Sequence, residues 1–370
     1  MASDPVTLAA LAAATGGHLA GPGEVVITDV THDSRRAGPG TLFVAIRGFT
    51  VDGHDYVGAA LDAGSPAVCV EDAAAAGEAA ALVVPDTRVA LGVLAAAVHR
   101  DPSAGLAVVG VTGTNGKTTV THLLEQVVAA AGMTPGLIGT NGARIAGEPM
   151  AVERTTPEAT DFQRMLAEMR DAGVDVAAVE VSSHALALGR VDATRFRVAA
   201  FTNLSRDHLD FHDDMEDYFR AKASLFVPDR AGKAVVWVDD PAGRRLAAEI
   251  EMPLTTVGLE PGADVIAADV ASDLSGSTFT ATGAFGNARI ELPIAGDFNV
   301  ANALVAAVCA AELGIGWDSI AAGIARVGRI AGRFEIVDAV EECTIVVDYA
   351  HTPEGIASVI GTARRLAPGA

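Results

Sequence analysis

The sequence predicts an α/β protein of more than one domain, with a phosphate-binding loop in a middle domain of mostly parallel sheet and antiparallel hairpins appended to that sheet. Three observations lead to this prediction. The chain has 370 residues, more than one compact core usually holds. Short Val/Ala/Ile-rich runs alternate with longer amphipathic segments, the pattern of α/β units. A glycine-rich segment, Gly113–Thr119, stands between a strand-like run and a helix-like run.

Composition and charge exclude several classes of protein. Half of the residues are hydrophobic, which excludes a disordered chain. The 26 basic and 47 acidic residues give a net charge of −21, which argues against nucleic-acid or anionic-membrane partners but not against one local phosphate pocket. Cys69, Cys309 and Cys343 have no metal-type spacing, so we expect neither a disulfide framework nor an oxidising compartment.

The beginning of the chain does not resemble a signal peptide. The residues before the first apolar stretch include the acidic Asp4 and no basic residue. No run of about 18 apolar residues occurs, so we expect no membrane span. A cytoplasmic protein is therefore the prediction.

The first block, residues 1–98, combines short strand candidates with Ala-rich helix candidates. Asp101–Gly105 has the composition of a linker. The expected strands of this block are Val25–Ile27, Leu42–Ile46, Ala67–Val70 and Leu82–Val84.

The second block, residues 99–332, opens with an apolar strand and a glycine loop, followed by a helix with one buried stripe. After Gly258 the sequence alternates and becomes β-rich, which predicts antiparallel hairpins. The stripe is formed by Val120, Leu123, Leu124, Val127 and Val128. The expected strands are Leu106–Val111, Val174–Val181, Val198–Thr202, Ala234–Val238, Ser277–Gly283 and Ala288–Leu292, with a helix at Val300–Glu312.

A third block is expected over residues 333–370, with a strand at Thr344–Asp348 and a helix at Gly355–Leu366. One strand and one helix cannot bury both faces of a sheet, so we infer the start of a truncated third domain. The alternative is that these residues simply pack on the second block.

The glycine loop has the chemistry of a phosphate site. Glycines let backbone N–H groups surround an anion, and the start of the following helix adds positive potential. Lys117 is placed to reach the β- and γ-phosphates, and the hydroxyl of Thr118 to hold Mg²⁺. Gly110 and Gly116 are five residues apart instead of four, so the strict motif is not met. A plain glycine turn does not explain Lys-Thr-Thr at a helix start, and no Asn-Lys-x-Asp motif supports a GTPase.

Three further side chains are candidates for the chemistry. Glu180 closes an apolar strand, where a Mg²⁺ ligand belongs, although an ordinary strand-end acid is the alternative. Asn203–Asp213 is rich in His and Asp, and from this stretch we single out only His208, because the other members fit a solvated acidic loop. Lys222 lies on an expected helix, Met215–Phe226, where it is either a reactive buried lysine or, more commonly, a snorkelling surface lysine.

These residues together resemble the Mur ligase family, the ATP-dependent amide-forming enzymes of peptidoglycan synthesis. The matches keep their order over nearly the whole chain. Within the family, the Asp-Ser-Arg, Thr-Thr-Pro and Ser-Ser-His segments most resemble the members that add the third residue of the stem peptide. The matching segments are Asp33-Ser34-Arg35, Asp52-Gly53-His54, Gly113–Thr119, Thr155-Thr156-Pro157, Glu180–His184, Thr202-Asn203-Leu204, Asp207–Asp210, Ala221-Lys222, Phe298-Asn299, Asn302, Gly332-Arg333 and Val347–Pro353.

The resemblance implies an N-terminal UDP-binding domain, a central ATPase and a C-terminal Rossmann-like domain that binds the incoming amino acid. It implies that ATP and Mg²⁺ are the cofactors, that UDP-N-acetylmuramoyl-dipeptide and a diamino acid are the substrates, and that the protein is a monomer. The implied nucleotide ligands are Gly113, Thr114, Asn115, Gly116, Lys117, Thr118, Thr119, Asn302, Arg333 and Asp348. The implied UDP-substrate ligands are Ser34, Phe49, Thr50, Val51, Thr155, Thr156, Ser182 and Arg190. The implied metal ligands are Thr118, Glu180, His208 and Lys222, the lysine as its N-carbamate.

The implied reaction begins with phosphorylation of the D-glutamyl carboxylate by ATP and ends with attack of an amine on the acyl phosphate. The implied amino acid is meso-diaminopimelate or L-lysine. The choice between the two stays open, because the family's recognition motif lies beyond residue 370. Two alternatives stay open: a related ligase such as folylpolyglutamate synthetase, and a catalytically silent nucleotide-binding fragment. For the 370-residue chain we expect binding without turnover.

Overall fold

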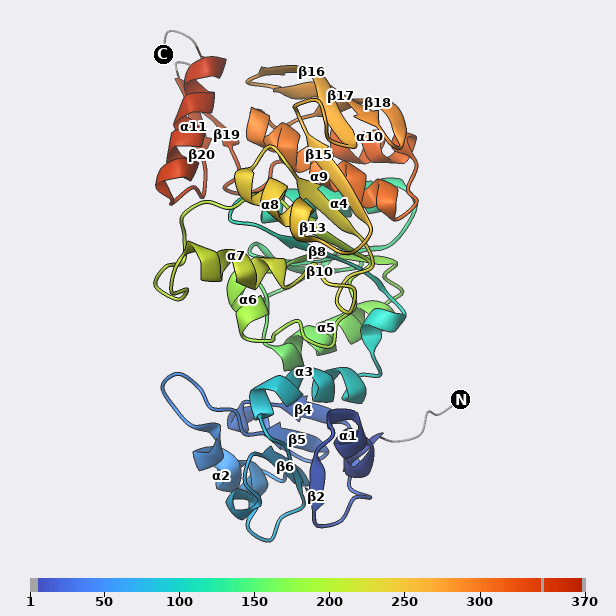
Figure 1. The fold of residues 1–370 in the computed structure, drawn as a ribbon, viewed down its shortest axis with the longest axis vertical. Helices are drawn as coiled ribbons and strands as arrows, with labels where there is room; N and C mark the ends of the chain where they lie inside the picture. Colours follow the sequence, from blue (N-terminus) through green and yellow to red (C-terminus); the bar gives the residue numbers. More distant parts are fainter. Residues whose placement is uncertain (1–5, 341–342, 368–370) are drawn as a thin grey trace. The chain divides into compact units, whose positions relative to one another are not determined.

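The computed structural model describes residues 6–340 and 343–367, except for the side chains at 338–340 and 343 (Figure 1). Asp4 and the side chain of Cys343 therefore lie outside the described residues. The chain divides into two compact units. Within the described part of the chain, no helix is both long enough and apolar enough to cross a membrane.

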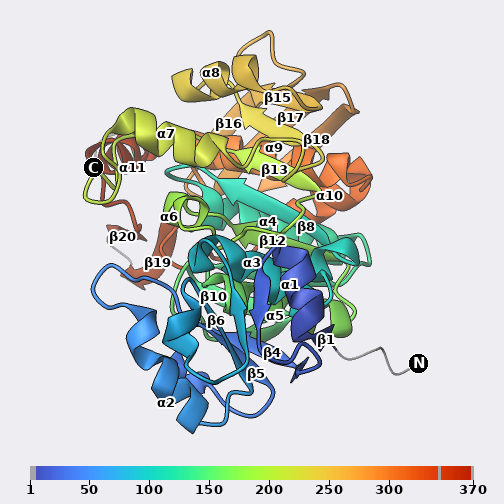
Figure 2. The same cartoon turned by 60° about the horizontal axis from the view of Figure 1, so that its bottom comes forward.

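The first unit comprises residues 6–105, 157–170 and 187–194 of the described chain. Its main sheet has the order β2-β7-β6-β5-β4, in which only β2 is antiparallel to its neighbour. Helices α1 and α3 cover one side of this sheet and α2 the other (Figure 2). Alternate residues of a strand face opposite sides, so Leu42 and Val44 join the cluster of α1 and α3, whereas Phe43 joins that of α2. The elements are β1 Val6–Thr7, α1 Leu8–Thr15, β2 His18–Ala20, β3 Val26–Ile27, β4 Asp29–Thr31, β5 Thr41–Val44, α2 Val57–Asp62, β6 Ala67–Val70, β7 Ala81–Val83, α3 Thr87–Val98 and α5 Ala159–Asp171.

The second unit comprises residues 106–156 and 171–186, with the described residues from 195 on. Its sheet has eleven strands in the order β11-β10-β9-β12-β8-β13-β14-β15-β16-β17-β18. The run from β9 to β16 is parallel, and antiparallel strands extend both ends. The strands are β8 Ala107–Thr112, β9 Pro135–Gly139, β10 Gly142–Ile145, β11 Glu148–Met150, β12 Val176–Glu180, β13 Val198–Phe201, β14 Ala234–Trp237, β15 Leu254–Gly258, β16 Val265–Asp273, β17 Gly276–Gly283 and β18 Gly286–Leu292.

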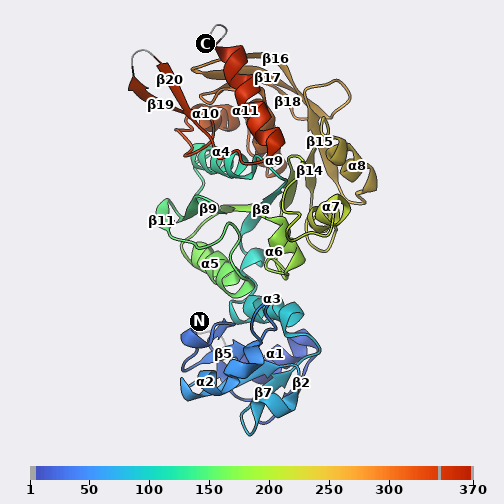
Figure 3. The same cartoon turned by 90° about the vertical axis from the view of Figure 1, so that its left-hand side faces the viewer.

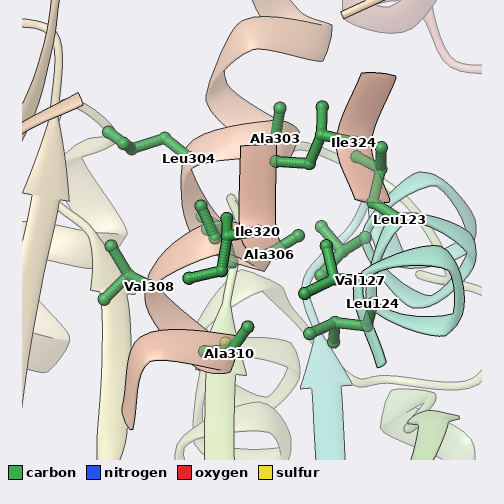
Figure 4. Close-up of a cluster of buried hydrophobic side chains, with 14 of the residues drawn as sticks. Leu123, Leu124, Val127, Ala303, Leu304, Ala306, Val308, Ala310, Ile320 and Ile324 are labelled. Carbon is green, nitrogen blue, oxygen red and sulfur yellow. The ribbon is translucent and has the colours of Figure 1, made fainter. Parts of the chain in front are cut away.

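The core of the second unit lies between this sheet and helices α4, α9 and α10 (Figure 4). The predicted stripe on α4, from Val120 to Val128, is buried there. Gly323 of α10 touches the backbone of α4 at Val127, a place with no room for a Cβ atom. The helices of this unit are α4 Lys117–Ala130, α6 Ser183–Ala187, α7 Met215–Ala223, α8 Pro241–Glu249, α9 Asp297–Glu312, α10 Trp317–Ala325 and α11 Pro353–Leu366.

The last described segment also belongs to the second unit. It forms the hairpin β19 Glu335–Val340 with β20 Cys343–Val347, followed by α11 (Figure 3). Arg365 on α11 pairs with Asp297 of α9 at 3.0 Å. The domain boundaries at residues 98 and 332 stay a prediction.

The α/β fold with a mostly parallel central sheet is confirmed, as are the antiparallel strands after Gly258. The sequence analysis did not identify the antiparallel extension β10–β11 at the other end of the sheet, nor helix α10.

Candidate active site

The glycine loop joins β8 to the first residue of α4, as predicted. Gly113 and Gly116 have φ values of +144° and +91°, a region that favours glycine. A side chain at either position would also collide, with Thr202 Oγ1 at Gly113 and with Asn302 Oδ1 at Gly116. The backbone N–H of Asn115 donates to Asn203 Oδ1 at 2.9 Å. The backbone of the loop is therefore fixed by close contacts, and the loop lies at the positive end of α4.

Lys117 folds back over this loop. Its Nζ donates to the carbonyl oxygens of Gly113 and Thr114, each at 2.9 Å. Desolvation lowers the pKa of Lys117, and the charge of Arg333 adds to this, whereas Glu180 and Asp207 act in the opposite direction. The ammonium group is thus held on neutral carbonyls at the point where a phosphate is expected.

Lys222 reaches the same loop from α7. Its side chain is 1% exposed, and its Nζ donates to the carbonyl oxygen of Gly113 at 2.9 Å. Burial, followed by repulsion from Lys117, holds the pKa of Lys222 well below its ordinary value, with Asp207 acting against the shift. The snorkelling alternative is therefore wrong, because Lys222 is buried and two lysines converge on one carbonyl oxygen.

Glu180 ends β12, beside the strand that leads into the glycine loop. It is fully buried, and its carboxylate accepts from the backbone N–H and the hydroxyl of Thr140 at 2.9 and 3.0 Å. A Cβ atom at Gly139 would strike Glu180 Oε1, so the carboxylate lies directly over that glycine. The acid that the sequence places at a strand end is thus next to the phosphate loop.

Three of the implied substrate ligands gather around Glu180 and Thr140. Thr155 Oγ1 lies 3.0 Å from Thr140 Oγ1. Thr156 donates its hydroxyl to the carbonyl oxygen of Glu180 at 2.8 Å, and the backbone N–H of Ser182 donates back to Thr156 at 3.1 Å. These hydroxyl groups form a polar cluster at the end of β12.

His208 has φ of +53°, uncommon for a residue with a side chain. Its Nε2 lies 3.5 Å from Asp207 Oδ2. Burial lowers the pKa of His208; Lys117 and Lys222 add to this, while Asp207 and Asp210 oppose it. Among the residues with described side chains, no group of three or more His, Cys, Asp or Glu is arranged to hold a metal ion.

Arg333 and Asp348 come from the last described segment of the second unit. Arg333 Nη2 donates to the hydroxyl of Thr118 at 2.7 Å, and its guanidinium carbon lies 5.3 Å from the centre of the Tyr349 ring. Asp348 accepts from the backbone N–H groups of Phe334 and Ala350, both at 2.7 Å. Arg333 thus reaches the phosphate loop, whereas Asp348 uses both carboxylate oxygens to fix the backbone beside it.

The remaining implied ligands belong to the first unit. Ser34 begins a short 3-10 helix capped by the side chain of Asp33. Phe49 is 81% exposed, and Thr50 and Val51 are exposed beside it on the loop after β5. Arg190 Nε lies 2.8 Å from Glu158 Oε1.

Tyr218 is a site residue that the sequence analysis missed. It is fully buried, and its hydroxyl lies 3.2 Å from Thr114 Oγ1 of the glycine loop. Lys222 Nζ lies 4.5 Å from the centre of its ring, within cation–π range. The signal was its position four residues before Lys222, on the same face of α7.

Comparison with known proteins agrees with this geometry. Residues 111–310 match the Mur ligase middle domain, and residues 26–101 match the Mur ligase family, catalytic domain. A UDP-N-acetylmuramoyl-L-alanyl-D-glutamate–2,6-diaminopimelate ligase of Streptomyces coelicolor is 46% identical over 361 residues, which cover 95% of this chain and 71% of that protein. The protein of the same name from Bacillus licheniformis is 40% identical, over 95% of this chain and 73% of that protein.

A solved structure supports the same grouping. It is a UDP-N-acetylmuramoyl-L-alanyl-D-glutamate–2,6-diaminopimelate ligase, with a TM-score of 0.84 and 28% identity, and the match covers 99% of this chain and 75% of that chain. These matches bear out the family that the motifs predicted. The chain belongs to the Mur ligase family and is an ATP-dependent, ADP-forming amide ligase of peptidoglycan precursor synthesis.

Proposed function

We propose that this chain carries the machinery to join 2,6-diaminopimelate to UDP-N-acetylmuramoyl-L-alanyl-D-glutamate with consumption of ATP, in the cytoplasm. The observation that carries the proposal is the convergence of Lys117 and Lys222 on the carbonyl oxygen of Gly113, beside the buried carboxylate of Glu180. The choice of diaminopimelate over lysine is supported by the names of the relatives described above.

The nucleotide part of the proposal rests on the glycine loop. We assign Gly113–Thr119 to the phosphates of ATP, with Lys117 moving from its two carbonyl partners to the phosphate oxygens. Arg333, which contacts Thr118, and Asn302, which packs on Gly116, are assigned to the same nucleotide. Asp348 is assigned to the ribose, although its carboxylate oxygens are engaged with backbone N–H groups in this structure.

We assign one magnesium ion to the oxygen atoms of Thr118 and Glu180. Thr118 offers a hydroxyl and Glu180 a carboxylate, the oxygen ligands that Mg²⁺ prefers. The carboxylate of Glu180 is fully buried and hydrogen-bonded to the neutral donors of Thr140, a setting that a cation would stabilise. Bound there, the ion would neutralise phosphate charge during transfer.

A second metal position, with His208 and Lys222 as ligands, requires a change in the lysine. An amine or ammonium group is not an oxygen ligand. A neutral amine can attack CO₂ to form a carbamate and release one proton, which turns Lys222 into a carboxylate donor. The strongly lowered pKa of Lys222 supports this step, because it raises the fraction of neutral amine.

The proposed reaction has two steps. The D-glutamyl carboxylate attacks the γ-phosphorus of ATP, which forms an acyl phosphate and releases ADP; Lys117 stabilises the charge that develops. The amine of the third amino acid then attacks the acyl carbon, and the tetrahedral adduct expels inorganic phosphate and loses a proton to give the amide. Holding the donor and the amine together supplies much of the rate.

The residues proposed for the UDP-linked substrate are given for each unit by itself. In the first unit these are Ser34, the loop Phe49–Val51 and Arg190. In the second unit they are Thr155, Thr156 and Ser182, which surround the end of β12. Exposed aromatic and aliphatic side chains on the Phe49–Val51 loop suit contact with a nucleobase.

The test separates binding from turnover. We expect the chain to bind ATP and UDP-N-acetylmuramoyl-L-alanyl-D-glutamate in separate titrations by calorimetry. Any phosphate release is expected to require ATP, the UDP-dipeptide and diaminopimelate together. Lys222→Ala should abolish ligation, spare ATP binding and regain activity with a short carboxylic acid. Phosphate release without either acceptor substrate would contradict the assignment, and binding of nucleotide alone would favour a silent nucleotide-binding protein.

A further inference from the structure

The first unit contains a buried carboxylate between two guanidinium groups. Glu158, the residue before α5, is 7% exposed. Its Oε1 lies 2.8 Å from Arg190 Nε, and its Oε2 accepts from Arg88 Nη1 at 2.9 Å. Arg88 lies in the first turn of α3, so three separate segments of the chain meet at this carboxylate. The implied roles above include Arg190 but neither Glu158 nor Arg88.

The charge of this cluster is unequal. Two guanidinium groups meet one carboxylate here. His32 lies in the same electrostatic environment, and its Nδ1 is 3.1 Å from Thr160 Oγ1. Burial lowers the pKa of His32, the carboxylates of Glu158, Asp161 and Asp33 oppose this, and Arg88 adds to it.

The geometry of the ion pairs also restricts motion. Arginine has a long side chain with many rotamers, and fixing it costs conformational entropy. Glu158 contacts a different guanidinium with each of its oxygens, and Arg88 thereby fixes the carboxylate that meets Arg190. Such preorganisation reduces the conformational entropy that is lost when a ligand binds to the arginine.

We propose that Glu158 is a positioning residue for substrate: through Arg190 Nε it holds the guanidinium where that group binds the D-glutamyl carboxylate of the UDP-linked dipeptide. Arg88 neutralises the second oxygen of Glu158. This inference rests on the proposed function of Arg190. Glu158 does not touch substrate itself, so its removal acts on the recognition of one part of the ligand.

A merely structural role for Glu158 would weaken every ligand of the first unit alike. The test therefore compares two ligands by calorimetry, UDP-N-acetylmuramoyl-L-alanyl-D-glutamate and UDP-N-acetylmuramoyl-L-alanine, which lacks the D-glutamyl group. In Glu158→Gln we expect affinity for the first ligand to fall about 10- to 100-fold, the range of hydrogen bonds to charged groups. Affinity for the second ligand should stay within about two-fold.

Variants of neighbouring residues complete the test. Arg190→Ala should give the same selective loss, and the double variant should be no weaker than Arg190→Ala alone, because the two residues act as one unit. Asp161→Asn is the matched control: this carboxylate, on the same α5, pairs with Arg36 and Arg164, and its loss should leave both affinities unchanged.

The outcomes separate the two hypotheses. An equal loss for both ligands in Glu158→Gln, or additive losses in the double variant, would overturn the positioning role and leave the proposed function intact. Failure of the unsubstituted chain to bind either ligand would overturn the proposed function and this role with it. Should Glu158→Gln not fold, as judged by its thermal midpoint and its ATP affinity, Glu158→Asp takes its place. The shorter carboxylate should still weaken only the D-glutamyl ligand, by several-fold.

Discussion

Two charged regions of this protein are built in opposite ways. At the phosphate loop of the second unit, Lys117 and Lys222 both donate to the neutral carbonyl oxygen of Gly113. In the first unit, Arg88 and Arg190 each meet an oxygen of Glu158. In the first region the lysines donate to carbonyl oxygens, and desolvation is the main cause that lowers their pKa values. The second region fixes its cations by pairing them.

This difference in pairing suggests a different role for each region in ligand binding. Lysines on neutral carbonyls can transfer to an anion without breaking an ion pair, so the phosphate loop is ready to accept one. Arginines bound to a buried carboxylate keep their place whether or not ligand is present, because breaking one such pair costs several kcal/mol. If both proposals hold, the glycine loop supplies binding energy and the ion pairs around Glu158 supply geometry.

The largest effect that would test this comparison is expected at Lys117. Lys117→Met keeps the length of the side chain and removes the charge. On the proposed assignment it removes charge-assisted hydrogen bonds to phosphate, so ATP affinity should fall by about 100-fold or more. Titration calorimetry with ATP measures the change. Lys233→Met is the control, because Lys233 in the same unit is 44% exposed and pairs with Glu312. A loss of less than about threefold in Lys117→Met would show that the charge at the loop is not used for phosphate.

A smaller effect is expected in the pH dependence of stability. In the folded chain the pKa of Lys222 is well below its ordinary 10.5, so between these two values the unfolded state binds more protons. The contribution of Lys222 to stability therefore rises with pH over that window and is constant below it. The advantage of Lys222→Met over the unsubstituted chain should shrink as pH increases toward 10, by at most about 1.4 kcal/mol per pH unit.

Urea unfolding at several pH values in CO₂-free buffer measures this slope. Lys233→Met, the same substitution at a partly exposed lysine of the same unit, is the matched control. A constant difference between Lys222→Met and the unsubstituted chain from pH 7 to pH 10 would mean that the amine is charged in the folded state. Its suitability for carbamate formation would then be lost.

The sequence predicts the second unit well where strands and helices repeat a simple pattern. The strand expected at Val198–Thr202 is β13, and the helix expected at Val300–Glu312 is α9, which begins three residues earlier at Asp297. The antiparallel strands β10 and β11 were not identified. They are short and hold glycine and proline, and they form by pairing along the edge of a sheet, which no local pattern specifies.

The candidate site divides in the same way. The glycine-rich segment between a strand pattern and a helix pattern was enough to predict where Lys117 and Thr118 lie. Glu180 was predicted beside them because it stands at the end of an apolar strand. The burial of Lys222 could not be predicted, because α7 carries charged residues as well as apolar ones and only the packing of the whole unit decides which face is inside. Glu158 was missed for a related reason: its partners, Arg88 and Arg190, lie 70 residues before it and 32 after it.

The smallest effect is expected where charges pair in water. Glu216 on α7 contacts both Arg245 and Arg220, and these hydrogen bonds, with Arg245 first, lower the pKa of its carboxyl to about 2. A depressed carboxyl pKa contributes to stability above its ordinary value of 4.5, and the contribution disappears as pH falls toward 2. The side chain is half exposed, however, so solvent screens the pairs. Glu216→Gln should shift the thermal midpoint at pH 7 by less than about 2 °C, as measured by scanning calorimetry.

Glu158→Gln, which removes the charge from a buried carboxylate between two arginines, should shift the thermal midpoint several times further. Equal shifts in the two variants would mean that burial is not what makes the Glu158 cluster rigid, and the contrast with the phosphate loop would then rest on charge count alone.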